Sequence, residues 1–286
     1  DLMVLNSNET TEINLVCKND DVFNEGLLQA VSECLNKKTA IVGKIGLTLD
    51  SSAVTIKPSP SFDAAFGLAV KTKNGSVTSG DTHALTKIDE GKFLLALSDG
   101  MGSGTRAKNT SSTAISLIES FYKAGLESNL ILGMVNKILT LNTDDNFSAM
   151  DILTVNLFDL KADFIKIGAP YSFIMTDSSI KIIEGNSLPL GILDDLAPTG
   201  CTTTLSDGET IIMVTDGISD AFSSSTDLVD YIRNLDNKNP QLIADSLLKK
   251  AISLQNGVSQ DDMTVLAVRI FKNASYCCCL FFKNII

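Results

Sequence analysis

Carboxylates stand at four places where a strand-like run of the sequence meets a loop. Asp99 and Asp216 each end an apolar run and precede a glycine, whereas Asp81 and Asp261 stand where a loop enters a run. Carboxylates gathered at one edge of a sheet repel each other, and some of them would have to take up protons. Divalent cations remove this conflict, and oxygen ligands without His or Cys favour Mg²⁺ or Mn²⁺. The pattern therefore predicts a metal site.

The stretch around Asp99 is the strongest of these signals. The unbroken apolar run Phe93–Leu97 is typical of a buried strand, and alternating glycines follow it at Gly100, Gly102 and Gly104. Glycines let the backbone approach a small charged ligand, because no Cβ stands in the way. A nucleotide-binding loop is an alternative interpretation. The spacing G-x-G-x-G argues against it, since it lacks both the G-x-G-x-x-G register and a Walker lysine.

Composition excludes several classes of protein. The net charge of the 286 residues is −11, which argues against a nucleic-acid partner and gives no attraction to an anionic membrane. The six cysteines include no C-x-x-C pair, so we expect free thiols in a reducing cytoplasm. We find no signal peptide and no apolar run of the ~20 residues that span a bilayer. Since the first residue is not Met, we expect the sequence to be a fragment.

The order of the expected elements predicts an α+β fold. Short strands follow one another without crossover helices, and the helices come in pairs, which favours a two-sheet β-sandwich flanked by paired helices over a doubly wound parallel sheet. Lys73-Asn74-Gly75 is a hairpin signal between the first two strands. The expected strands are 62–72, 79–88, 93–99, 152–160, 164–167, 172–175, 180–183, 211–216 and 263–271, and the expected helices are 104–124, 129–141, 227–235 and 240–254.

Residues 1–50 form a separate element in this interpretation. We expect a strand over 11–17 and an amphipathic helix that starts at Asp20 and carries Phe23, Leu27, Val31 and Leu35 on one face. The segment 51–60, with its two prolines, is expected to break helix and sheet and to mark the boundary. The main domain then covers 51–272. The tail 273–286, with Cys277, Cys278 and Cys279, has no assigned role.

Four segments resemble, in order, the motifs of the metal-dependent PP2C-type (PPM) protein serine/threonine phosphatases. The Asp-Gly-Met-Gly-x-Gly form of the second motif, together with Ser187–Ile192, is similar to the branch of that family that acts in bacterial sporulation. The resemblance covers about residues 50–272. It implies a PP2C-like fold of α-β-β-α layers over 51–272 and makes 1–50 the end of an upstream regulatory region. The four segments are Val77–Asp81, Leu97–Gly104, Thr215–Ile218 and Asp261–Val265.

The resemblance also implies two Mn²⁺ or Mg²⁺ ions. A pair of such ions about 4 Å apart lowers the pKa of a water and clamps a phosphate. Asp99 would bridge both ions, and Gly100 would bind one of them through its backbone carbonyl. Asp262 stands where many relatives carry Asn, so it is expected to support the ligands and not to bind directly. The implied catalytic residues are Asp81, Asp99, Asp216 and Asp261, and the implied metal ligands are these four aspartates and Gly100.

The sequence departs from the family beside the site. Many eukaryotic relatives carry His after the Asp-Gly pair, as a candidate general acid, and here the residue is Met101. For the only histidine, His83, we expect a structural or solvent-facing role. Arg106 either holds the substrate phosphate or is a solvated or helix-capping residue.

By resemblance, the substrate is a phosphoserine anti-anti-sigma factor, a small STAS-domain protein, and its dephosphorylation activates a sporulation sigma factor. We expect no nucleic-acid partner, and a homodimer is compatible with this interpretation. The domain would be cytoplasmic, and a membrane contact would come only from an upstream region absent from this sequence. The alternative is a catalytically inactive PP2C-like signalling or scaffold domain. The presence of every expected carboxylate argues against it.

Overall fold

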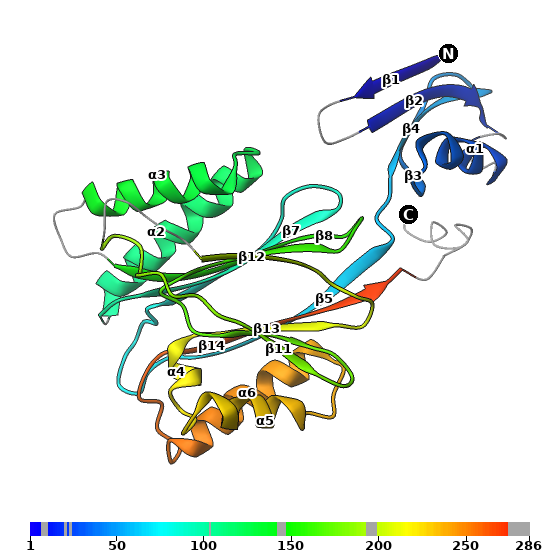
Figure 1. Ribbon diagram of the computed structural model, residues 1–286. Helices are drawn as coiled ribbons and strands as arrows, with labels where there is room; N and C mark the ends of the chain where they lie inside the picture. The colour runs from blue at the N-terminus through cyan, green and yellow to red at the C-terminus, as the bar shows by residue number, and fades with distance from the viewer. Residues whose placement is uncertain are drawn as a thin grey trace. The chain divides into compact units, whose positions relative to one another are not determined.

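The computed structural model describes residues 1–6, 11–19, 22, 25–102, 104–141, 147–192 and 199–273. The chain forms two compact units, Asp1–Ser61 and Phe62–Ile286. Figure 1 labels the helices and strands of each unit.

The first unit is a four-stranded antiparallel sheet with one helix, α1 (Glu25–Leu35). Val54 and Ile56 are fully buried and pack with Ile13 against the helix residues Leu28 and Val31. Of the residues predicted for the apolar face of the helix, Val31 and Leu35 pack in this core, and Leu28, which was not predicted, packs there as well. The strands, in the sheet order β1-β2-β4-β3, are β1 (Leu2–Asn6), β2 (Thr11–Lys18), β4 (Ser51–Pro58) and β3 (Thr39–Gly46).

The predicted boundary after residue 50 is wrong. Segment 51–58 does not break the sheet but forms its inner strand β4, which pairs with both β2 and β3. Alternate residues of β4 point into the core, and Pro58 is only its last residue, where a missing N–H costs little. The first unit therefore ends at Ser61.

The second unit contains two five-stranded sheets in which every pairing is antiparallel. One sheet has the order β12-β9-β8-β7-β6, and its strands are β12 (Thr199–Thr204), β9 (Lys161–Ile167), β8 (Ser148–Asn156), β7 (Lys92–Gly100) and β6 (Asp81–Lys87). The other has the order β11-β10-β13-β14-β5, and its strands are β11 (Ile180–Ile183), β10 (Ser172–Met175), β13 (Thr210–Val214), β14 (Met263–Lys272) and β5 (Phe62–Lys71).

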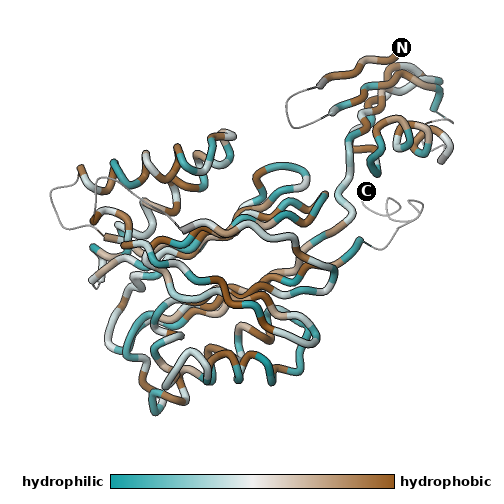
Figure 2. Tube along the Cα trace, viewed as in Figure 1, coloured by the Kyte–Doolittle hydropathy of each residue, from teal (hydrophilic) through white to brown (hydrophobic). Residues whose placement is uncertain are grey.

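Helices cover the outer faces of both sheets, as Figure 1 shows. The pair α2 (Gly104–Lys123) and α3 (Ser128–Leu141) packs on β6–β9, and α5 (Ser225–Arg233) and α6 (Pro240–Leu254) pack on the other sheet together with the short α4 (Asp216–Ser219). A third core, which includes Leu95, Leu153 and Met213, fills the space between the sheets. Hydrophobic residues follow the strands of both sheets in Figure 2. The predicted α-β-β-α sandwich is confirmed.

Two details of the second unit differ from expectation. Lys73-Asn74-Gly75 does not close a hairpin, because β5 pairs along ten residues with β14, and β6 pairs with β7. The Asn74 N–H instead donates to the carbonyl of Ser259, 3.0 Å away. Strand β12 was not expected, because its sequence Thr-Gly-Cys-Thr-Thr-Thr has no apolar pattern and it forms an edge of its sheet.

Several expectations lie outside the described residues. They are the predicted helix start at Asp20 with Phe23, and the tail from 274 onward with its three cysteines. Among the helices that the structure describes, none is long and apolar enough to cross a membrane.

Candidate metal centre

Asp81 is the most deeply buried of the predicted carboxylate ligands. It is 4% exposed and faces Asp99 directly across β6 and β7. Its Oδ2 accepts hydrogen bonds from the hydroxyls of Thr215 (2.9 Å) and Thr264 (2.7 Å), so it ties β6 to the ends of β13 and β14. Its buried Oδ1 has no hydrogen-bond partner among the described residues. Burial raises the pKa of Asp81 to about 6 against the hydrogen bonds that lower it.

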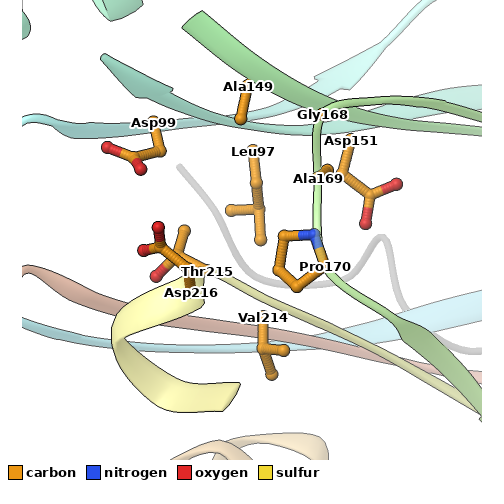
Figure 3. Close-up of a pocket in the computed structure, with 10 residues that line it drawn as sticks. All are labelled: Leu97, Asp99, Ala149, Asp151, Gly168, Ala169, Pro170, Val214, Thr215 and Asp216. Carbon is orange, nitrogen blue, oxygen red and sulfur yellow. The ribbon is translucent and has the colours of Figure 1, made fainter. Parts of the chain in front are cut away.

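Asp99 and Asp216 face one small pocket from different sheets. Asp99 lies near the end of β7, and Asp216 begins α4 just after β13. In the view of Figure 3 their carboxylates lie on the same side of the pocket. Burial, followed by the charges of Asp216 and Asp81, raises the pKa of Asp99 to about 8. Burial and then the charge of Asp261 also raise the pKa of Asp216. The carboxylates are therefore close enough to repel each other.

The neighbours Asp261 and Asp262 have different surroundings. Asp261 is exposed, and its nearest cation is Lys73, with Nζ 3.9 Å from Oδ1. Asp262 accepts two backbone hydrogen bonds, from the N–H groups of Lys73 (2.8 Å) and Gly80 (2.6 Å). Both carboxylate oxygens of Asp262 thus hold the loop that leads into β6. This geometry agrees with a supporting role for Asp262.

The peptide group between Asp99 and Gly100 is held at both ends. Its N–H donates to the carbonyl of Gly80 (3.3 Å), and its carbonyl accepts from the hydroxyl of Ser148 (2.9 Å). In a regular ladder the Gly80 N–H would bond the Gly100 carbonyl in return. Here that N–H donates to Asp262, which leaves the Gly100 carbonyl without its usual ladder donor. Asp262 therefore acts on the predicted carbonyl ligand through Gly80.

Gly100 also lies where a side chain does not fit. A Cβ at this position would stand 2.1 Å from the carbonyl oxygen of Ala107 in α2, so the backbone of the helix would have to move. We expect Gly100→Ala to lower the melting temperature and to weaken Mn²⁺ binding, measured by thermal melting and by titration calorimetry. Gly133→Ala in α3 is the matched control, because nothing lies within 4 Å of its Cβ. Alanine is favoured there by about 0.5–1 kcal/mol. Unchanged Mn²⁺ binding by Gly100→Ala would contradict a ligand role for this backbone.

These residues fit a divalent cation by their chemistry. The donors are oxygens only, a buried carboxylate oxygen of Asp81 lacks a partner within the described ranges, and the backbone at Gly100 leaves no room for a side chain. In the part of the chain that the structure describes, however, no three acidic, histidine or cysteine side chains converge on one point. The carboxylates are neighbours and do not form a closed ligand set, so their roles as ligands remain predictions.

Three further residues beside the site, His83, Met101 and Arg106, are exposed. His83 lies on an exposed part of the edge strand β6, and desolvation followed by the charge of Lys108 lowers its pKa, so it is neutral at pH 7. Met101 is 54% exposed directly after Gly100. Arg106 is exposed in the first turn of α2.

A buried ion pair at the same pocket was not predicted. Lys166 on β9 and Asp151 on β8 are each 1% exposed and are cross-strand partners, with Nζ 2.6 Å from Oδ2. Ser172 of the other sheet donates to the same oxygen and accepts from Lys166. In Figure 3, Asp151 lies on the far side of Leu97 and Pro170 from Asp99. The available signal was a single charge inside each of two apolar runs, 150–155 and 164–167.

Comparisons with known proteins identify the family of this chain. The family model of stage II sporulation protein E (SpoIIE) matches residues 89–271. Stage II sporulation protein E of Priestia megaterium is 32% identical over 72% of this chain, and that of Bacillus subtilis (strain 168) is 32% identical over 78%. The chain spans only 36% and 27% of the length of these two curated relatives.

A solved structure of a SpoIIE protein is also similar to this chain. It contains the PP2C phosphatase domain and a fragment of the regulatory domain of SpoIIE from Bacillus subtilis, at 27% identity and a TM-score of 0.81, and the match covers 96% of this chain and 82% of that one. The sandwich is the fold of a PP2C-type serine/threonine phosphatase domain. Within that class, the chain belongs to the SpoIIE family.

Proposed function

We propose that this chain is a metal-dependent protein serine/threonine phosphatase. The observation that carries the proposal is the group of carboxylates at one end of the two sheets, where burial and mutual repulsion raise the pKa values of Asp81, Asp99 and Asp216. Bound Mn²⁺ or Mg²⁺ would supply an activated water and a clamp for the phosphate. Clusters of perturbed carboxylates are typical of functional sites.

The chain's own residues have distinct parts in this proposal. Asp99, Asp216 and Asp261 hold the cations with their carboxylates, and the Gly100 carbonyl adds a backbone ligand. Asp81 fixes the distance between the two sheets through its threonine hydrogen bonds and has one oxygen left for a cation. No side-chain nucleophile is required.

We further propose that the substrate is a phosphoserine anti-anti-sigma factor with a STAS domain, and that the reaction activates a sporulation sigma factor. Membership of the SpoIIE family and the sporulation-type motif at 99–104 support this. Residues 1–61 are proposed as part of a regulatory region, and the domain is proposed to work on the cytoplasmic side. The match to a structure that includes a regulatory fragment supports the first of these assignments. An inactive scaffold is the competing proposal.

The direct test is release of phosphate from a phosphoserine STAS protein. We expect turnover with Mn²⁺ and none after treatment with a chelator. A protein that binds Mn²⁺ and releases no phosphate from any phosphoserine protein would instead favour the scaffold.

Metal binding should also stabilise the fold by mass action. At a free Mn²⁺ concentration 100 times the dissociation constant, the free energy of unfolding should rise by about 2.7 kcal/mol per site. Thermal melting over a range of Mn²⁺ concentrations measures this effect, with Ca²⁺ as a comparison ion. A melting temperature independent of Mn²⁺ would contradict the presence of a site.

A further inference from the structure

Ser148 lies beside the peptide group that joins Asp99 to Gly100, and the carbonyl of Gly100 is the predicted backbone ligand. It is the first residue of β8, it is fully buried, and it pairs across the sheet with Gly100. Its hydroxyl is 2.9 Å from the Asp99 carbonyl, closer than to the carbonyl of Ala149 (3.3 Å). The hydroxyl of Ser98 lies 2.7 Å from the same Oγ. A hydroxyl has one proton, so when Ser148 donates to Asp99, Ser98 donates to Ser148.

The backbone of Ser148 is held on its other side. Its N–H donates to the carbonyl of Leu190 (3.1 Å), and its carbonyl accepts from the Leu190 N–H (2.9 Å). The next residue, Gly191, donates its N–H to Oδ1 of Asn136 (2.9 Å), which is 1% exposed in α3. A buried chain of hydrogen bonds therefore runs from α3 through the segment 190–191 to the Asp99 carbonyl.

Neighbouring hydrogen bonds also hold the backbone that carries the predicted metal ligands Asp99 and Gly100. The Met101 N–H donates to the carbonyl of Phe147 (3.0 Å), so residues 147–148 grip the backbone on both sides of Gly100. On the opposite side, Asp262 and Gly80 hold the Gly100 N–H. The 99–100 peptide joins the two Cα atoms that carry the Asp99 side chain and the Gly100 carbonyl, so a displacement of this peptide would change the position of these two predicted ligands relative to each other.

We infer that Ser148 is a positioning residue for the metal centre, whose hydroxyl fixes the Asp99–Gly100 peptide so that the side-chain and backbone ligands face one ion. This inference rests on the proposed function. The competing explanation is that the two serines fill a buried polar gap, in which case either hydroxyl is equally dispensable for metal binding.

The chain offers a matched pair of variants. Ser148→Ala removes the donor to the Asp99 carbonyl, whereas Ser98→Ala removes a buried hydroxyl at the same place and leaves that donor. We expect both to lower the metal-free melting temperature to a similar extent. Partners that orient metal ligands typically contribute 10–100-fold in affinity. Ser148→Ala should therefore weaken Mn²⁺ binding about 10-fold, measured by titration calorimetry, and Ser98→Ala should stay within about twofold of wild type.

Activity provides a second readout. At saturating Mn²⁺ we expect Ser148→Ala to lower kcat and to leave KM for the phosphoprotein unchanged, since the substrate surface is intact. If Ser148→Ala does not fold, Ser148→Cys replaces it, because a thiol keeps the shape and donates weakly. Equal Mn²⁺ affinities for the Ser148 and Ser98 variants would overturn the inference. A different outcome would overturn the proposed function: a wild-type protein that binds Mn²⁺ but hydrolyses no phosphoserine protein.

Discussion

Asp99→Asn should abolish phosphatase activity without unfolding the protein. Asp99 is the carboxylate on which the charges of Asp216, Asp81, Asp261 and Asp262 all act, so any cation that relieves the repulsion has to contact it. We expect the rate of phosphate release to fall more than about 100-fold, because loss of a ligand should exceed the loss of a residue that only orients one. Single-turnover phosphate release at saturating Mn²⁺ measures the effect. A near wild-type rate would exclude the mechanism.

The metal-free protein provides the control through its pH dependence. The pKa of Asp99 is raised from 3.8 to about 8 in the folded state, so the unfolded chain gives up this proton first as the pH rises. Stability is therefore lost between about pH 4 and pH 8, and it is greatest when Asp99 is protonated. Asparagine mimics the neutral acid. In chelator, Asp99→Asn should lose less stability than wild type across this window. If the curves of unfolding free energy against pH ran parallel for the two proteins, repulsion at Asp99 would be contradicted.

The second large effect concerns stability and arises at Lys166. Lys166→Met leaves the carboxylate of Asp151 buried without its cation, and breaking a buried pair in this way typically costs about 3–5 kcal/mol. We expect a loss of that size in the free energy of unfolding, measured by urea denaturation of the metal-free protein.

A double variant separates the charge from the packing. Replacement of both partners of a buried ion pair by apolar residues is often neutral or stabilising. Lys166→Met combined with Asp151→Leu should therefore recover most of the stability lost by Lys166→Met alone. A double variant as unstable as the single one would mean that the shape of Lys166, and not its charge, is what the fold requires.

The elements with a clear local pattern could be predicted from the sequence. Strands β10 and β11 and helix α6 have the expected bounds, because turn residues or a first-turn proline mark their ends. The prediction of a hairpin at 73–75 was wrong because the pairing of β5 is decided by a strand far away in the sequence. A turn signal states only that the chain reverses, and the ladder of β5 is completed by a strand almost 200 residues later in the sequence.

The same distinction holds at the site. Asp99 and Asp216 were found from the sequence because each ends an apolar run before a glycine. The support behind them was not visible, since Ser148 reaches Asp99 only through the register of β7 and β8. The link from Asp262 to Gly80 joins residues 182 positions apart. Hydrogen bonds of this kind depend on which strands become neighbours, and a single sequence does not state that.

The pairing of β5 with β14 has a consequence for synthesis of the protein. The first strand of the second unit, β5, gains its partner only when the ribosome has added β14, so this sheet does not close before residues 263–272 have been made. The sheet of the first unit uses only residues before 59 and is complete much earlier. Long-range strand pairing is slow to form, and an unfinished chain exposes its unpaired edge. A nascent chain that has not reached residue 261 carries Asp81, Asp99 and Asp216 but not the fourth aspartate, so the proposed metal site stays incomplete until that residue has been added.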